Sequence, residues 1–305
     1  MRDALPPEQT GPQAWYGPDL ARRADWIEVL SPEDQDEIRA AVATLAASGG
    51  PPSPATFPLP RLGPRLGAIR DELLHGRGFA VLRGLPIDGD AELAFAGLGS
   101  HLGSARSQNR HGHLVGHVRD LGLSSADPNV RVYQTNERQT FHTDSCDVVG
   151  LLCLRTARVG GESLLVSSST IWNEMRRRRP DLAALLLEPI ATDRRGEVPP
   201  GRQPFYAIPV FHWYEGHLSA LYQRQYVDSA QRFPDAPRLT SAHLEALDLF
   251  DALANDPALH LSMTLAPGHA SHRRSRWRRR SGSGQSTNAV RSWSRVWLWL
   301  SLIHI

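Results

Sequence analysis

The 305-residue chain contains no lysine, so all 34 of its basic residues are arginine. Alanine, glycine and proline are abundant as well, and this combination indicates a gene of very high G+C content, in which arginine codons displace lysine codons. The formal net charge is only +2, so the charge balance by itself points to no class of partner. Apolar residues make up 41% and charged residues 22%, which is ordinary for a globular protein.

Cysteine is nearly absent, and the only two are Cys146 and Cys153. They are seven apart, so in one strand they would point to opposite faces and could not pair locally. So few cysteines favour a reducing, cytoplasmic compartment over a disulfide framework. The proline-rich N-terminus carries acidic residues, unlike a signal peptide, and the longest apolar stretch, VWLWLSLI, is too short to span a bilayer. We therefore expect a cytoplasmic enzyme or binding protein with no membrane partner.

The hydrophobic patterns predict an α+β fold with a mainly β core. Helices are predicted over residues 32–48, 64–75, 90–102, 171–179, 181–189 and 241–254. Strands are predicted over residues 78–86, 114–122, 131–136, 147–157, 162–168, 205–213, 218–227 and 259–265. Short strands preceded by helices suggest a β-sandwich or jelly roll with flanking helices, although the pattern does not separate this from other α+β folds.

The segment QTFHTDSCDVVG places His142 and Asp144 two residues apart, directly before an apolar run. At a strand edge, side chains i and i+2 project to the same face, so this pair can converge on one ion. About one such triplet is expected by chance in a chain of this composition. His243-Leu244-Glu245 has the same spacing, but it lies in a predicted helix, where residues two apart do not face each other.

An imidazole and a carboxylate from one strand, joined by a distant histidine, form the facial triad of non-haem Fe(II) oxygenases. Spacing alone leaves a surface pair open as the alternative. The surrounding motifs add to the pattern: YQTNERQTFHTD, GLLCLRTARVGGESLLVSS and HLSALYQRQYVDSAQRFPDAPRLT follow one another in the chain. Together with GRGFAVLRGLP and SQNRHGHLVGHVRDLG, they resemble the Fe(II)/2-oxoglutarate-dependent dioxygenases of the taurine dioxygenase (TauD/TfdA) family, from about residue 70 to Gly268.

The resemblance implies a double-stranded β-helix, or jelly roll, over residues 61–268, preceded by a helical and irregular segment over residues 1–60. It implies that His142 and Asp144 are the catalytic residues and hold Fe(II), and that Ser163 supplies a hydroxyl to the 2-oxoglutarate site. Such an enzyme consumes 2-oxoglutarate and O₂, releases succinate and CO₂, and hydroxylates a small organic molecule. A zinc hydrolase built on the same pair is a weaker alternative, since no candidate base is evident, and a homo-oligomer stays open.

Other polar residues are candidates for the reactant pocket. Tyr133 and Gln134 are predicted to contact substrate and Asn136 the cosubstrate, with ordinary strand or turn roles as the alternative. Arg224 lies on a predicted strand that presents alternate residues on one face. It could bind a substrate carboxylate through two parallel hydrogen bonds, and a structural salt bridge is the alternative.

No Asp or Glu occurs after Asp256, and the family pattern ends abruptly at Gly268. Residues 269–305 hold eight arginines and four of the eight tryptophans. One interpretation is a basic tail that contacts nucleic acid, and a second is a segment that binds an anionic membrane. The interpretation that we favour is a reading-frame error in G+C-rich DNA, ending in LSLIHI, which resembles translated sequencing adaptor. Nucleic acid is then not an expected partner.

The family pattern places the third iron ligand, a histidine, near residues 277–280, with a 2-oxoglutarate-binding arginine beyond it. Neither motif is present there, and nothing in the surroundings of His269 and His272 matches it. We therefore expect that this polypeptide has little oxygenase activity. The alternative from another class is a non-catalytic binding protein that uses its Arg/Trp-rich tail.

Overall fold

The computed structural model describes residues 5–107, 112–124, 130, 132–274 and 297–304. The helices are α1 (Gly17–Ala21), α2 (Pro32–Ser48), α3 (Gly63–His75), α4 (Ala91–Leu102), α5 (Ser168–Arg178), α6 (Pro180–Leu185), α7 (Arg224–Ala230) and α8 (Ser241–Asn255), with one 3₁₀ turn, η1 (Val132–Gln134). The strands are β1 (Ile27–Val29), β2 (Phe79–Arg83), β3 (Ser104–Ala105), β4 (Val115–Val118), β5 (Val148–Arg155), β6 (Ser163–Leu165), β7 (Ile190–Asp193), β8 (Phe205–Ile208), β9 (Phe211–Tyr214), β10 (His217–Ala220), β11 (Leu261–Met263), β12 (Ala270–Arg274) and β13 (Trp297–His304).

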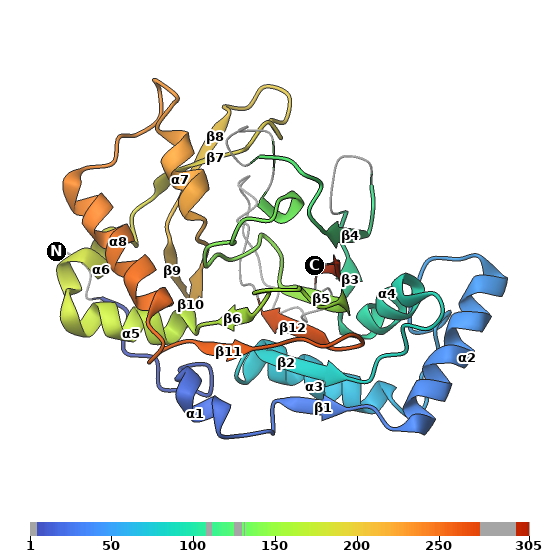
Figure 1. Ribbon diagram of the computed structural model, residues 1–305. Helices are drawn as coiled ribbons and strands as arrows, with labels where there is room; N and C mark the ends of the chain where they lie inside the picture. The colour runs from blue at the N-terminus through green and yellow to red at the C-terminus, as the bar shows by residue number, and fades with distance from the viewer. Residues whose placement is uncertain (1–4, 108–111, 125–129, 131, 275–296, 305) are drawn as a thin grey trace, which may run out of the picture.

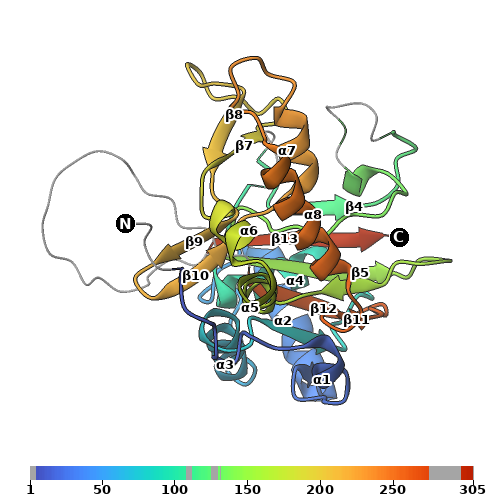
Figure 2. The ribbon, with the colours of Figure 1, turned by 90° about the vertical axis from the view of Figure 1, so that its left-hand side faces the viewer.

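A seven-stranded sheet forms the centre of the described fold. Its strands run in the order β1-β2-β12-β5-β13-β3, and β4 pairs with β13. Figure 2 shows β12, β5 and β13 running next to one another across the molecule. Three two-stranded ladders lie outside this sheet: β9 with β10, β6 with β11, and β7 with β8. Helices and strands are therefore mixed, and the described strands do not close into a barrel.

The central sheet is apolar on both faces because its strands alternate between two cores. Leu82 of β2 packs into a cluster with residues of α2, α3 and α4, whereas Phe79 and Val81 of the same strand pack with Trp26 on the other face. Figure 1 shows α3 beside β2 in the lower part of the molecule. A third cluster lies among α5, α6, α8, β9 and β10 and includes the fully buried Trp172. The start of β2 and the start of α5 both line one cavity.

Most helix positions were predictable because their end signals are local. Ser31 accepts a hydrogen bond from the Asp34 backbone N–H at 3.2 Å, and Asp34 accepts one from the Ser31 N–H at 2.9 Å, so α2 begins with a capping box. The predicted helices over residues 64–75, 90–102 and 241–254 correspond to α3, α4 and α8, within a residue or two at each end.

One predicted strand is wrong, and another is correct only in its first part. Residues 132–134 form the 3₁₀ turn η1, because the Thr135 hydroxyl and N–H both donate to the Val132 carbonyl and draw the backbone into a turn. Residues 224–227 open helix α7 instead of extending β10. The Arg224 guanidinium pairs with Asp228, one turn further along, and this i, i+4 contact favours the helix.

The sequence patterns separate residues 269–305 from the domain over residues 61–268. In the structure, however, β12 and β13 of this segment both belong to the central sheet. β12 pairs with β2 and β5, and β13 pairs with β5 in parallel. Ala270 and His272 are each about 1% exposed. The described strands of this segment are therefore paired within the sheet.

In the part of the chain that the structure describes, no helix is both long enough and apolar enough to cross a membrane. Cys146 and Cys153 are buried, and no disulfide joins them. Burial raises the pKa of the Cys153 thiol.

Candidate active site

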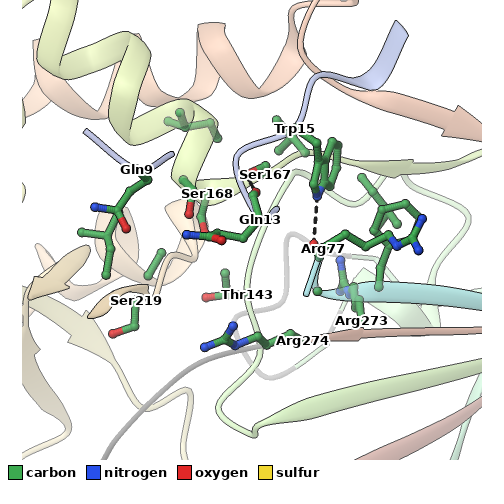
Figure 3. A pocket seen from close by; sticks show the side chains of 18 of the residues that line it. Gln9, Gln13, Trp15, Arg77, Thr143, Ser167, Ser168, Ser219, Arg273 and Arg274 are labelled. Atoms are coloured by element: carbon green, nitrogen blue, oxygen red, sulfur yellow. Dashed lines mark hydrogen bonds between the residues drawn. The ribbon is translucent and has the colours of Figure 1, made fainter. Parts of the chain in front are cut away.

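A cavity of about 320 Å³ lies between the central sheet and the start of α5. Its size falls in the range of small-molecule sites. The apolar part of the lining includes Phe79, Phe141, Leu165, Ile171 and Phe250. The polar part includes Gln13, His142, Thr143, Ser167, Ser168, Ser169, Ser219, Tyr222, Arg77, Arg273 and Arg274; Figure 3 shows several of these side chains. Apolar walls with a few polar groups are typical of a site for a small organic molecule.

The predicted pair, His142 and Asp144, converges in the structure. His142 Nε2 and Asp144 Oδ1 are 3.9 Å apart, and each side chain is 18% exposed. The pair lies in an extended segment before β5, where His142 forms an isolated antiparallel bridge with Gln223. One ion can reach both atoms, because 3.9 Å is less than two metal–ligand distances of about 2.1 Å each.

The orientation of the His142 ring suits a metal ligand. Nδ1 lies 2.8 Å from the Thr140 carbonyl oxygen, which can only accept a hydrogen bond. Nδ1 therefore carries the hydrogen, and the lone pair of Nε2 faces Asp144. Together with the hard carboxylate oxygens of Asp144, this donor set fits Fe(II).

The residue between the pair ties it to a neighbouring element. The Thr143 N–H donates to the Tyr222 carbonyl at 2.9 Å, and the Tyr222 N–H donates to the Thr143 hydroxyl at 2.8 Å. The Tyr222 hydroxyl in turn donates to Asp251 at 2.6 Å, which also binds Arg224 at 2.9 Å. Burial, followed by the charge of Asp251, raises the pKa of Tyr222. The phenol is therefore a fixed donor, and its ring is 2% exposed.

A guanidinium from β12 contacts the acidic member of the pair. Arg273 NH2 lies 3.2 Å from Asp144 Oδ2. Arg273 pairs across the ladder with Phe79, which also lines the cavity, so the strand presents this residue to the cavity side. The same carboxylate therefore faces both His142 and a fixed positive charge.

Alternation along β12 turns His272 to the other face of the sheet. Its ring centroid lies 5.8 Å from that of Phe95 in the core beneath the helices, and neither ring nitrogen has a hydrogen-bond partner. Burial lowers the pKa of His272 to about 4. His272 is thus a neutral core residue on the face opposite Arg273. Among the described residues, no three His, Cys, Asp or Glu side chains form a group that could hold a metal ion.

Of the predicted site residues, His142 alone lines this cavity, and Asp144 lies beside it, 3.9 Å from the His142 ring. Ser163 lies on β6 one residue before the lining Leu164, and Asn136 is exposed. Tyr133 and Gln134 lie in η1, where their carbonyls accept from Arg119 and Leu121.

Arg224 binds three carboxylates, Asp228 at 3.0 Å, Asp248 at 2.8 Å and Asp251 at 2.9 Å. These contacts are the structural salt bridge that the sequence left open as the alternative. Arg224 does not line the cavity, so a role of Arg224 in substrate binding stays a prediction.

Sequence reasoning missed the serines at the start of α5 and the two arginines of β12. Ser167 is the N-cap of α5 and accepts from the Thr170 N–H, and a Ser/Thr run before an apolar pattern signals such a cap. Arg273 and Arg274 belong to residues 269–305, which we interpret from the sequence as a reading-frame error. No sequence pattern therefore predicted that these two arginines line a cavity.

Comparison with known proteins gives a consistent result. The model of the taurine catabolism dioxygenase TauD, TfdA family matches residues 23–270. FR-33289 synthase from Streptomyces rubellomurinus is 33% identical over 282 residues, which are 88% of this chain and 81% of that protein.

Two solved oxygenase structures share the fold. An asparagine oxygenase in complex with Fe(II), 2S,3S-3-hydroxyasparagine and succinate aligns with a TM-score of 0.58 at 18% identity, covering 84% of this chain and 89% of that one. The non-heme iron oxygenase OrfP in complex with Fe and alpha-ketoglutaric acid aligns with a TM-score of 0.54 at 16% identity, covering 83% and 89%.

The family match spans most of the chain, including the segment with His142 and Asp144. The resemblance seen in the sequence motifs is thereby confirmed. By family the protein is a non-haem iron dioxygenase that uses Fe(II) and 2-oxoglutarate. The chain belongs to the taurine catabolism dioxygenase TauD, TfdA family.

Proposed function

We propose that His142 Nε2 and the Asp144 carboxylate are the Fe(II) ligands of this chain, at the edge of a jelly-roll core. The cavity beside them would hold a small organic substrate, which is hydroxylated while 2-oxoglutarate is converted to succinate and CO₂. The observation that carries the proposal is the 3.9 Å convergence of the two donors, with Nδ1 of the ring already bound to the Thr140 carbonyl.

When bound, Fe(II) supplies the coupling between oxidative decarboxylation of 2-oxoglutarate and oxidation of a substrate C–H bond. The residues of the chain position the reactants. The Thr140 carbonyl holds the His142 ring, and the paired hydrogen bonds between Thr143 and Tyr222 fix the backbone between the two ligands. Phe141 and Phe250 form an apolar wall that orients substrate and limits the access of water.

The remaining predicted site residues enter the proposal with different support. Ser163 is kept for the cosubstrate hydroxyl contact on the sequence motif alone, because it does not itself line the cavity. Tyr133, Gln134 and Asn136 are kept on their position in the sequence alone. Arg224 is the weakest, since three carboxylates already engage its guanidinium.

We also propose that this polypeptide binds Fe(II) weakly and turns over slowly. Residues 273–303 contain no His, Cys, Asp or Glu, so the segment in which the family places its distal ligand offers none. A site with two protein ligands leaves most of the coordination sphere to solvent and cosubstrate, and the metal then dissociates more easily.

The test is an anaerobic Fe(II) titration combined with an assay of 2-oxoglutarate-dependent succinate release, on the wild type, H142A and D144A. The matched control is H212A, because His212 is an exposed histidine on β9 outside the cavity lining. We expect H142A and D144A to weaken Fe(II) binding at least tenfold and H212A to leave it unchanged. Equal binding in all four proteins would exclude the pair as the iron site. Succinate release at the rate of an intact family member would contradict the proposed impairment.

A further inference from the structure

The cavity beside His142 has a one-sided charge. Its lining includes three arginines, Arg77, Arg273 and Arg274, and no Asp or Glu among the described residues. Two of these cations are compensated. Arg77 binds Glu72 at 2.7 Å and Asp25 at 2.9 Å, and Arg273 lies 3.2 Å from Asp144.

Arg274 differs from them, because the described residues include no carboxylate that pairs with it. Its Nε and Nη2 atoms are buried, and neither has a hydrogen-bond partner there. Its backbone is well held, because the N–H donates to the Gly78 carbonyl at 2.7 Å at the end of β12. In Figure 3 its side chain extends toward the side of the cavity where Thr143 and Ser219 lie, whereas Arg77 lies on the opposite side with Trp15.

Two buried guanidinium nitrogens without an acceptor are costly, because they have lost the water that solvated them. Unlike lysine, arginine cannot relieve that cost by losing its proton. A ligand oxyanion would supply both the missing acceptors and the opposite charge, and the planar guanidinium suits binding through two parallel hydrogen bonds.

The start of α5 favours the same sign of ligand. Ser167, Ser168 and Ser169 all line the cavity at the N-terminal end of this 11-residue helix. The first backbone N–H groups of a helix have no partner within it and carry a partial positive charge. The Ser168 and Ser169 hydroxyls, the start of α5 and a guanidinium therefore border one small volume.

We propose that Arg274 anchors the anionic group of a small molecule in this cavity, a carboxylate or a phosphate-type oxyanion. This inference rests on the proposed function, because it takes the cavity beside His142 as the binding site of the reactants. The anion has two possible sources: 2-oxoglutarate itself, or an acidic group on the substrate. The shared chemistry is an oxyanion on Arg274.

The experiment is isothermal titration of the full metal-free chain, so that anion binding is measured without iron. The wild type, R274Q, R274K and R22Q are each titrated with 2-oxoglutarate, and then, saturated with 2-oxoglutarate, with inorganic phosphate. R22Q is the matched control, since Arg22 is a 71% exposed arginine whose partner is Asp19 on the surface. Thermal unfolding checks that each variant folds, and we expect R274Q to be at least as stable as wild type, because it removes two buried guanidinium nitrogens that have no partner.

A loss of at least tenfold in 2-oxoglutarate affinity in R274Q, with partial retention in R274K, assigns the site to the cosubstrate. A tenfold loss for phosphate with 2-oxoglutarate unchanged assigns it to the substrate. Wild-type protein that binds neither anion, or R274Q that binds both as well as wild type does, overturns the proposal. A loss as large in R22Q overturns it too, since the effect is then one of net charge. Fe(II) titration of H142A tests the proposed function separately.

Discussion

Replacing Arg273 with glutamine should tighten Fe(II) binding, although the residue lies beside the proposed ligands. Arg273 NH2 is 3.2 Å from Asp144 Oδ2, so it occupies one oxygen of the proposed iron carboxylate. It also holds a positive charge near the place where a dication must enter. An incoming Fe(II) ion therefore competes with the guanidinium for Asp144 and is repelled by it.

The size of the effect follows from the exposure of the pair. The side chains of Arg273 and Asp144 are 26% and 18% exposed, so the contact is partly screened by solvent. Ion pairs of this kind contribute about 1 kcal/mol, near the upper end for exposed pairs and well below the values for fully buried ones. A competing contact of about 1 kcal/mol corresponds to an affinity change of about fivefold.

The assay is an anaerobic Fe(II) titration of wild type and R273Q, with R22Q as the control for net charge. We expect the dissociation constant of R273Q to fall about fivefold and that of R22Q to stay the same. Unchanged or weaker binding in R273Q would refute the reasoning. It would mean that the guanidinium does not compete with the metal, and that it holds the carboxylate in its binding orientation.

Three further predictions concern the frame around the site. His272→Leu should remove a loss of stability at acidic pH, because burial lowers the pKa of His272 to about 4. Between about pH 6.5 and about pH 4, only the unfolded chain takes up a proton on this histidine. The free energy of unfolding of the wild type therefore falls by up to about 3 kcal/mol across that window. Urea unfolding at about pH 7 and about pH 5 checks this, and equal pH dependence of variant and wild type would contradict it. Tyr222→Phe should cost about 1 to 2 kcal/mol, because Asp251 loses the donor at 2.6 Å, and an unchanged melting temperature would argue against that hydrogen bond. Gly268→Ala should lower the free energy of unfolding by at least about 1 kcal/mol, because φ of Gly268 is +80° and the added Cβ would lie 2.8 Å from the Leu85 carbonyl oxygen. A midpoint of urea unfolding equal to that of wild type would show that the turn relaxes.

The parts of the fold that the sequence predicted are those governed by local chemistry. The capping box at Ser31 and the apolar run over residues 79–82 act on their own neighbours, and α2 and β2 lie where expected. The region around Arg224 could not be predicted in this way. Arg224 pairs locally with Asp228, but its guanidinium is also held by Asp248 and Asp251 of α8, more than 20 residues further along the chain, and no local pattern shows these contacts.

The same division holds for the site. The convergence of His142 and Asp144 follows from their spacing, because two residues of an extended segment fix both side chains. The cavity could not be foreseen, since α5, β2 and β12 meet there only after the sheet has formed. The alternation that sends Arg273 to the cavity and His272 to the opposite core depends on the pairing of β12 with β2 and β5, which no local pattern encodes.

The most direct test of the central claim is X-ray absorption spectroscopy of the full chain loaded anaerobically with Fe(II). If His142 and Asp144 form an iron site with two protein ligands, the spectrum should contain the scattering of a single imidazole, with oxygen atoms in the other positions. That imidazole signal should disappear in H142A and persist in H212A. Two or more imidazoles on the metal, or a spectrum unchanged in H142A, would contradict the account.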